Sequence, residues 1–364
     1  MKILLMTTGL GLGGAERQVC DLADEFVRQG YRVIVISLND RLEIRPNSKM
    51  VKLYTLSMQK SLLGFLSSLC RARQVVIDFQ PDVVHSHMYH ANIFARILRC
   101  IVSVPRLICT VHSSYEGGWF RGFIYRLTDR LASQNTIVSD YARHIFIESR
   151  AIPANRLITL SNGIDTTRFK FRPYIRSELR SKFGISDDDI LLLSVGRLEE
   201  VKNYPELISA IDLLLNQERI ASSIKLFVLG QGAMLGELER LVKEKALNER
   251  VQFIGARNNI EEWLSACDML ILPSLFEGFG LVALEALSCE RPVVSTKNIG
   301  VKNEVERFGT ISSTPYAPKL AESIRKAIQN IGCFNGQEAR RLIVEKYSIQ
   351  YVASRWIDVY LGAK

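Results

Sequence analysis

The chain lacks the features that mark secreted, metal-binding and membrane-spanning proteins. Its seven cysteines are dispersed along 364 residues, and no two of them have the C-x-x-C spacing of a zinc or redox motif. An odd, scattered set of cysteines is typical of a reducing cytoplasm, so we expect neither disulfides nor a bound metal. No window approaches about 18 uncharged apolar residues, so no transmembrane helix is predicted. The apolar N-terminus is too short for a signal peptide and is predicted to be a strand.

Acidic residues are in deficit only in the N-terminal half of the chain. Residues 1–170 carry 22 Lys and Arg against 13 Asp and Glu, whereas residues 171–364 carry 25 of each. The N-terminal half therefore holds the whole net charge of +9. A basic half favours an acidic partner, which could be nucleic acid, an anionic lipid surface or a phosphorylated substrate. The alternative is a basic surface without such a partner.

The order of apolar runs and amphipathic stretches predicts an α/β protein with two Rossmann-like, doubly wound parallel sheets. Strands and helices alternate through the first half, and the pattern restarts at the apolar run 190–195. We expect an N-terminal domain over residues 1–172, a second domain over 173–345 and an aromatic-rich terminal helix over 346–364. The two domains are expected to face each other across a cleft, with ligands at the carboxyl ends of the strands.

The most informative motif is a pair of carboxylates around a glycine turn, Glu277-Gly-Phe-Gly-Leu-Val-Ala-Leu-Glu285. An apolar run that is typical of a buried strand precedes it, and residues 281–287 are predicted to form a helix. The backbone N–H groups of Phe279, Gly280 and Leu281 then lie at a helix N-terminus, which favours an anion. A phosphate on these amides, with a carboxylate for hydroxyl groups on either side, matches the layout of a sugar nucleotide.

A pair of cations follows the first predicted strand of the second domain. Arg197 and Lys202 flank the start of the next helix. At a strand end opposite the Gly-Phe-Gly turn, they would neutralise a diphosphate. The alternative is a solvated surface pair, which the neighbouring carboxylate motif disfavours. Another strand is followed by the loop 254–259, which contains Arg257 and whose backbone is positioned to bond a nucleobase edge.

Glycines follow the first predicted strand of the chain. Gly9, Gly11 and Gly14 have G-x-G-x-x-G spacing, and the second strand ends near Asp40. This is the sequence form of a dinucleotide-binding fingerprint, and it supports an NAD-dependent oxidoreductase as a rival interpretation. The same glycines also fit a loop that closes over any phosphate, or a simple tight turn.

Histidines lie near two other strand ends of the first domain. His112 follows the strand at 107–111 and is placed to bond a substrate hydroxyl or to transfer a proton, although a structural role fits equally well. His85 and His87 lie on one side of a strand by period two, an arrangement that is common in metal sites. No carboxylate or cysteine close in sequence completes a ligand set, so no metal site is predicted.

Together these motifs resemble the retaining GT-B glycosyltransferases of the large group 1 family, glycosyltransferase family four, which includes sucrose synthase and bacterial mannosyltransferases. The resemblance covers nearly the whole chain. The pattern differs at Asn203, where the family more often has glycine. The matching segments are Val195-Gly-Arg-Leu, Lys202-Asn203, Phe227-Val-Leu-Gly-Gln-Gly232, Val251-Gln-Phe-Ile-Gly255 and Glu277 through Ala286 in the second half, and Gly13-Gly-Ala-Glu16, Pro81-Asp-Val-Val-His85, Thr110-Val-His112 and Ser161-Asn-Gly-Ile-Asp165 in the first.

The resemblance implies a role for most of these residues. Glu277 would contact the donor sugar and Glu285 the ribose, while Arg197 and Lys202 would hold the diphosphate. His112 would lie near the donor sugar and the bond that breaks. Transfer would proceed with retention and without a metal, because fixed cations and a helix N-terminus stabilise the leaving diphosphate. Gly13 and Gly14 would lie against the donor from the opposite domain, and the terminal helix would cross back onto the first domain.

The predicted function is therefore that of a hexosyltransferase. We expect a nucleotide-sugar donor such as a UDP- or GDP-sugar, no further cofactor, and a glycan or lipid-linked acceptor in bacterial cell-surface polysaccharide or lipopolysaccharide synthesis. We expect no nucleic-acid partner. The alternatives are the NAD-dependent oxidoreductase and a non-catalytic subunit that binds nucleotide sugars. The predicted location is cytoplasmic, peripheral on the inner membrane.

The membrane expectation comes from one segment in the basic half, residues 117–130. As a helix it places Trp119, Phe120, Phe123, Ile124 and Leu127 on a broad apolar side, with Arg121, Arg126 and Arg130 around it. Aromatic residues interleaved with arginines suit a helix that lies on an anionic membrane surface. The alternative is that the apolar side packs into the domain core and the arginines are ordinary solvated residues.

Overall fold

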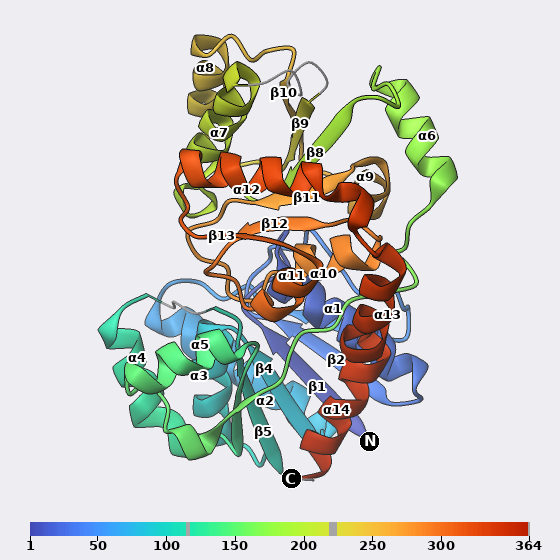
Figure 1. The fold of residues 1–364 in the computed structure, drawn as a ribbon. Coiled ribbons are helices and arrows are strands. Elements are labelled where there is room, and N and C mark those ends of the chain that lie inside the picture. Colours follow the sequence, from blue (N-terminus) through green and yellow to red (C-terminus); the bar gives the residue numbers. More distant parts are fainter. Residues whose placement is uncertain (114–116, 218–223, 363–364) are drawn as a thin grey trace. The chain divides into compact units, whose positions relative to one another are not determined.

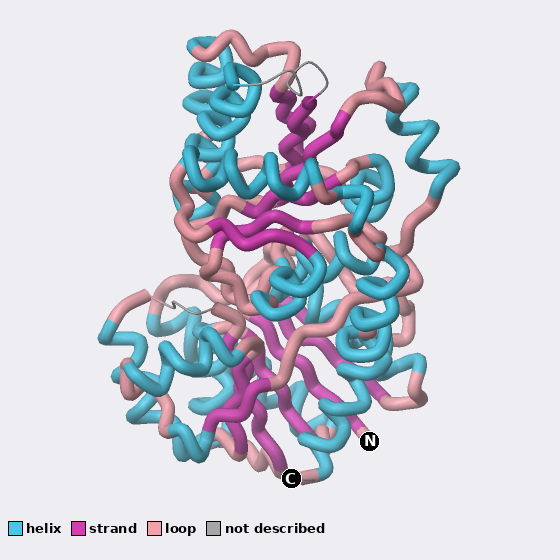
Figure 2. Tube along the Cα trace, viewed as in Figure 1, coloured by secondary structure: helices cyan, strands magenta, loops and turns pink. Residues whose placement is uncertain are grey.

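The computed structural model describes residues 1–113, 117–217 and 224–362, which form two compact units (Figure 1). Unit 1 comprises Met1–Ile164 with Tyr347–Lys364, and unit 2 comprises Asp165–Lys346. Each unit is built on one parallel sheet with helices on both of its faces (Figure 2). The predicted α/β class with two doubly wound parallel sheets is therefore confirmed. The unit boundaries fall at Ile164 and Tyr347. The boundaries expected from the sequence lie near residues 172 and 346.

Unit 1 has a seven-stranded sheet in the order β3-β2-β1-β4-β5-β6-β7. This order reverses direction at β1, as a doubly wound sheet requires. The elements are β1 (Lys2–Thr7), α1 (Gly14–Arg28), β2 (Arg32–Ser37), β3 (Lys52–Thr55), α2 (Leu62–Phe79), β4 (Val83–His87), α3 (Tyr89–Arg99), β5 (Arg106–Val111), α4 (Trp119–Thr128), η1 (Asp129–Leu131), β6 (Gln134–Ile137), α5 (Asp140–Glu148), η2 (Ala154–Arg156) and β7 (Leu157–Thr159).

The apolar residues of β1 alternate between two cores, because successive side chains of a strand point to opposite faces. Leu4 and Met6 pack with α2 and α3 on one face of the sheet. Ile3 and Leu5 pack on the other face with α1 and with α14 (Ile349–Leu361). The terminal helix α14 thus belongs to unit 1, as predicted. Its start is capped by Ser348, which accepts a hydrogen bond from the backbone N–H of Tyr351.

Unit 2 has a six-stranded sheet in the order β10-β9-β8-β11-β12-β13. The carboxyl ends of the adjacent strands β8 and β11 lie at the point where the strand order reverses. The elements are α6 (Pro173–Lys182), β8 (Ile190–Val195), η3 (Glu200–Lys202), α7 (Tyr204–Gln217), β9 (Ile224–Leu229), α8 (Leu235–Glu244), β10 (Val251–Gly255), α9 (Ile260–Ala266), β11 (Met269–Leu272), α10 (Leu281–Ser288), β12 (Val293–Thr296), α11 (Lys302–Phe308), β13 (Gly309–Ser312), α12 (Ala317–Gln329), η5 (Ile331–Cys333) and α13 (Gly336–Tyr347).

The unit 2 sheet is covered by separate groups of helices. Helices α7, α8 and α12 share one apolar core with alternate residues of the strands, including Leu192 of β8 and Leu226 of β9. Figure 1 shows α12 lying across the sheet, with α7 next to α12 and α8 next to α7. Helix α6 packs against α9. Within the described part of the chain, no helix is both long and apolar enough to cross a lipid bilayer.

Candidate active site

At the carboxyl edge of the unit 2 sheet, the predicted cation Lys202 contacts the predicted carboxylate Glu277. Lys202 ends the short helix η3 that follows β8, and Glu277 lies in the loop between β11 and α10. Because β8 and β11 are neighbours in the sheet, the two loops meet. Lys202 Nζ donates a hydrogen bond to Glu277 Oε2 at 2.6 Å, and the two side chains are only 18% and 21% exposed.

Asn203 holds these two loops in place. Its Nδ2 donates to the backbone oxygens of Pro273, at 3.1 Å, and Pro315, at 2.8 Å. Its backbone has a φ of 57°, in the left-handed region that asparagine tolerates better than most residues. The loops are also joined by the backbone N–H of Leu275, which donates to the oxygen of Val201 at 2.9 Å. The asparagine that departs from the family pattern therefore keeps the left-handed backbone and adds two side-chain hydrogen bonds.

The glycine turn after Glu277 positions the N-terminus of α10. Gly280 is the N-cap of α10 with a φ of 94°, and a Cβ there would lie 2.6 Å from the side chain of Ile299. The turn is fixed to the loop after β12, because the backbone N–H of Glu277 donates to the oxygen of Asn298 at 2.9 Å. Only glycine meets both the backbone and the space requirement. Glu285 follows in the second turn of α10 and is only 8% exposed.

Arg197 is placed differently from Lys202. Its Nη1 donates to Glu199 Oε1 at 2.7 Å, and the Arg197 side chain is 62% exposed. The structure thus brings Lys202 to Glu277 but leaves Arg197 at the surface of the same loop. This loop packs closely on the glycines after β9, since a Cβ at Gly230 would lie 1.9 Å from the oxygen of Gly196.

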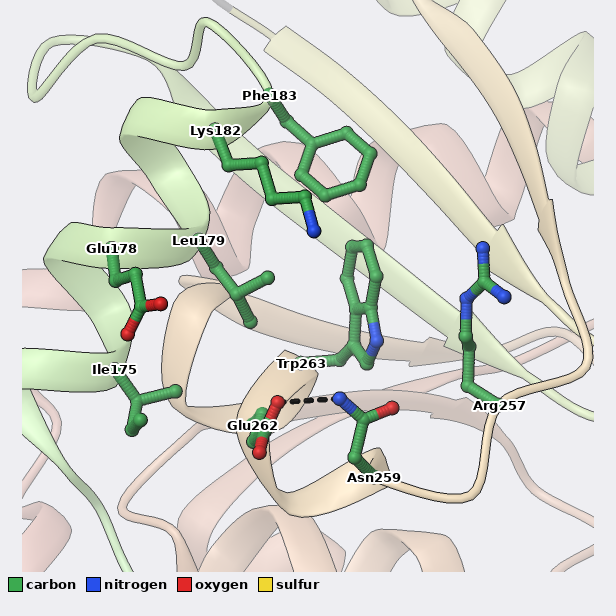
Figure 3. Close-up of a pocket in the computed structure, with 9 residues that line it drawn as sticks. All are labelled: Ile175, Glu178, Leu179, Lys182, Phe183, Arg257, Asn259, Glu262 and Trp263. Atoms are coloured by element: carbon green, nitrogen blue, oxygen red, sulfur yellow. Dashed lines mark hydrogen bonds between the residues drawn. The ribbon is translucent and has the colours of Figure 1, made fainter.

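Arg257 lines a pocket of unit 2. The pocket has a volume of about 470 Å³ and lies between α6, α9 and the loop after β10. Figure 3 shows the Trp263 indole between Leu179 of α6 and the Arg257 side chain. Neither Lys202 nor Glu277 is among the described residues that line this pocket.

His112 of unit 1 is paired with a second histidine. It follows β5, and its Nε2 lies 3.0 Å from Nδ1 of His87, the last residue of the neighbouring strand β4. Burial lowers the pKa of His112 to about 4 and holds the pKa of His87 well below its usual range, so both rings are neutral near pH 7. In a neutral pair one ring donates and the other accepts, so the hydrogen bond couples the tautomer of His112 to that of His87.

His85 connects this pair to the terminal helix. Its Nδ1 lies 2.6 Å from Tyr360 Oη of α14, its Nε2 lies 2.6 Å from Thr110 Oγ1, and its ring stacks on His87 with centroids 3.9 Å apart. The period-two spacing of His85 and His87 was a usable signal that two imidazoles share one side of β4. Among the described residues, no group of three or more His, Cys, Asp or Glu side chains is placed to hold a metal ion.

The N-terminal glycines form the start of α1. Gly13 is the extended N-cap and Gly14 the first helical residue. A Cβ at Gly13 would lie 2.3 Å from the carboxylate of Glu16 in the same helix. Asp40, which the rival NAD interpretation assigns to a ribose, is exposed and accepts a hydrogen bond from Ser57 Oγ at 2.5 Å.

Two family models match most of the chain. The model described as Glycosyl transferases group 1 matches residues 175–346, and the model described as Glycosyltransferase Family 4 matches residues 12–168. The matched ranges correspond closely to unit 2 and to the first segment of unit 1.

Relatives and solved structures agree with these models. An uncharacterised glycosyltransferase of Methanocaldococcus jannaschii is 25% identical over 99% of this chain and 98% of its own length. The Escherichia coli UDP-Gal:alpha-D-GlcNAc-diphosphoundecaprenol alpha-1,3-galactosyltransferase is 28% identical over 70% of this chain and 68% of its own. The structure of Anabaena HepE in complex with UDP has a TM-score of 0.84 at 22% identity and covers 100% of both chains.

The structural likeness shows the GT-B fold, and the family models assign both halves of the chain to glycosyltransferases. This assignment favours the transferase over the NAD-dependent oxidoreductase. The chain belongs to the group 1 glycosyltransferases.

Proposed function

We propose that the protein is a retaining hexosyltransferase that moves a sugar from a nucleotide sugar, such as a UDP- or GDP-sugar, to a glycan or lipid-linked acceptor. The observation that carries this proposal is the contact between Lys202 and Glu277 beside the N-terminus of α10. A cation, a carboxylate and a helix N-terminus at one sheet edge suit a ligand that carries both phosphates and hydroxyl groups. A sugar diphosphate has both.

Each predicted residue of unit 2 takes one part of the donor in this proposal. Lys202 and Arg197 bind the diphosphate, and the amides of Phe279, Gly280 and Leu281 face its oxygens. Glu277 accepts hydrogen bonds from the sugar hydroxyls. The buried Glu285 accepts them from the ribose, and the loop that contains Arg257 contacts the nucleobase. To bind a phosphate, Lys202 must break its hydrogen bond to Glu277 or share its N–H donors between Glu277 and the ligand.

The proposed chemistry breaks the bond between sugar C1 and the diphosphate oxygen and forms a bond between C1 and an acceptor oxygen on the same face. The acceptor proton passes to the departing diphosphate. Lys202, Arg197 and the N-terminus of α10 stabilise the negative charge that develops there. In the proposal, His112 of unit 1 acts near the donor sugar, and Gly13 and Gly14 contact the donor. The reaction as proposed requires no metal, because fixed positive groups carry out the charge stabilisation.

Relatives support a nucleotide-sugar donor and a lipid-linked acceptor. HepE was crystallised with UDP, and the name of the Escherichia coli relative gives UDP-Gal as donor and a diphosphoundecaprenol as acceptor. We therefore propose a cytoplasmic enzyme of bacterial cell-surface polysaccharide or lipopolysaccharide synthesis. All seven cysteines are unpaired, which fits a reducing compartment.

A donor screen tests the proposal. Calorimetric titration of the protein with UDP, GDP, ADP and their sugars, and with NAD, should give binding of at least one sugar nucleotide and none of NAD. The sugar nucleotide that binds should then lose its sugar to water or to an added lipid-linked acceptor. Binding without any sugar release would favour the non-catalytic subunit, and binding of NAD alone would overturn the proposal.

A further inference from the structure

Helix α4 turns its apolar side to solvent. Trp119 is 82% exposed, Phe123 53% and Leu127 69%, and Phe120 is exposed beside them. These positions recur at intervals of three and four residues, so they form one stripe along the helix. The alternative that this stripe packs into the domain core is therefore wrong.

The opposite side of α4 is held to the domain by polar contacts around one aromatic residue. Tyr125 is buried, and its hydroxyl accepts a hydrogen bond from Asn92 Nδ2 at 3.0 Å. The fully buried guanidinium of Arg96 lies over the Tyr125 ring, with 5.0 Å to the centroid. Arg96 also donates to the backbone oxygen of Tyr125 at 3.1 Å and to Thr128 Oγ1 at 2.7 Å. These contacts fix the rotation of α4, so its apolar stripe stays outward.

The start of α2 adds a second apolar stripe at the same end of α3. Leu62 is 75% exposed and Leu63 80%, and Leu66 one turn later is also exposed. Helix α3 packs against both α2 and α4, and Figure 1 shows α3 and α4 side by side. The pKa of His90, at the start of α3, is lowered by burial and then by the positive charges of Arg121 and Lys60. The residues next to both stripes therefore lie near His90.

Within their own segments, the charged residues of these stripes are all positive. No Asp or Glu occurs in residues 60–77 or 117–128. Lys60, Arg126 and Arg130 are exposed at their edges. An apolar surface with a basic rim is complementary to a bilayer with anionic headgroups, where side chains enter the interface and cations meet the phosphates. A second copy of the same surface would place like charges against each other, so it is a poorer partner.

We propose that this α2–α4 surface docks the protein on an anionic lipid bilayer. The surface consists of Leu62, Leu63, Leu66, Trp119, Phe120, Phe123 and Leu127, with the basic rim of Lys60, Arg126 and Arg130.

The starts of α3 and α4 lie at the edge of the unit 1 sheet that also carries His112. His112 and the residues that lead to α4 both follow β5, and α3 starts directly after β4. A bilayer bound there lies near the edge from which His112 is proposed to act. The docking does not require the transfer reaction, so it goes beyond the proposed function.

Vesicle flotation of the full chain tests the proposal without any donor or acceptor. Vesicles of equal parts phosphatidylglycerol and phosphatidylcholine should carry the protein at low ionic strength, and high ionic strength should release it. Vesicles of phosphatidylcholine alone should bind it much more weakly. The double variant Arg126→Gln, Arg130→Gln should lose about fivefold in affinity for each charge removed, since each basic residue near such a surface contributes about 1 kcal/mol.

A matched pair of aromatic variants separates docking through this surface from nonspecific adsorption to vesicles. Trp119→Ser with Phe123→Ser should weaken vesicle binding by at least about tenfold. Tyr174→Ser removes an aromatic side chain of unit 2 that is 76% exposed and should leave binding unchanged. Thermal unfolding midpoints within error of the parent protein verify that each variant folds. Absence of binding at low ionic strength, or equal binding by the Trp119/Phe123 variant, would overturn the proposal. The proposal would also be overturned if the protein bound no vesicles and sedimentation showed self-association that the Trp119→Ser, Phe123→Ser variant abolished.

Discussion

Replacing Glu277 by glutamine separates the two partners of the ion pair. Glu277→Gln keeps the shape of the side chain and removes the charge that now holds Lys202 at 2.6 Å. In the proposed site, Lys202 must turn from Glu277 to a phosphate when the nucleotide binds. The variant should therefore impair handling of the sugar without weakening the bare nucleotide.

The expected magnitudes follow from the burial of the pair. Both side chains are about one-fifth exposed, so the pair is worth more than a surface ion pair but is still screened by solvent. Releasing Lys202 should leave the affinity for free UDP or GDP unchanged or raise it by up to about fivefold, which corresponds to about 1 kcal/mol. Loss of a charged acceptor for the sugar hydroxyls costs about 1.5–3 kcal/mol, so kcat/KM should fall by about 10-fold to 150-fold.

Calorimetry with the bare nucleotide and initial rates with the sugar nucleotide measure the two effects separately. The control is Glu322→Gln, which breaks a comparable pair with Lys319 at 2.8 Å on the exposed surface of α12. That variant should change neither quantity. If Glu277→Gln weakens the bare nucleotide about as strongly as it lowers kcat/KM, Glu277 binds the nucleotide and the assignment to the sugar is wrong.

Three further predictions concern single residues. Glu285→Ala should weaken bare UDP or GDP by about 1.5–3 kcal/mol in calorimetry, because a buried ribose contact is lost, and unchanged affinity would refute that role. Burial lowers the pKa of His112 to about 4, below the ordinary 6.5. As the pH falls through the window from 6.5 to about 4, the unfolded chain binds a proton at His112 before the folded chain does. The free energy of unfolding should therefore fall by up to about 3 kcal/mol across this window. Urea denaturation at both ends of the window should show a smaller fall in His112→Asn, and an equal fall would contradict the assignment. Asn203→Gly should lower the free energy of unfolding by about 1–3 kcal/mol through two lost hydrogen bonds. Asn203→Ala should lower it by about 1 kcal/mol more, because of the positive φ, and the reverse order would show that the backbone strain is not significant.

The sequence predicted the strands that are buried along their whole length and the helices that have a clear apolar face. Strand β1 and the pair β11 and α10 were expected within about a residue of their observed bounds. Strand β3 was not expected, because its four residues alternate between exposed and half-buried and lie at the edge of the sheet. Its pairing with β2 is a tertiary interaction that four residues of sequence do not specify.

The candidate site was predictable in position but not in its contacts. Strand ends and glycine turns place Lys202 and Glu277 at one edge, because adjacent parallel strands end together. The sequence does not indicate that Lys202 bonds Glu277 whereas Arg197 bonds Glu199. The partner of a long, flexible side chain depends on which carboxylates the folded loops bring within its reach. The positive φ of Asn203 was also hidden, because it depends on the loop in which Asn203 lies.

The orientation of α4 shows a different limit. The apolar stripe of Trp119, Phe123 and Leu127 fits a core or a surface equally well by periodicity alone. The decision comes from Arg96 and Tyr125, which lie 29 residues apart in the chain and make a buried polar anchor. A buried arginine is uncommon unless it is paired, so sequence rules do not anticipate it.

The central claim is that Lys202 and Arg197 stabilise the departing diphosphate. The measurement that tests it most directly is the single-turnover rate of sugar release in the double variant Arg197→Ala, Lys202→Ala, with saturating donor. Loss of one preorganised donor to the developing charge costs about 2.7–4 kcal/mol, and this magnitude applies to Lys202, which is only 18% exposed, rather than to the exposed Arg197. We therefore predict a fall of at least about 100-fold in a protein that still folds. A double variant that transfers sugar at the rate of the parent protein would contradict the account.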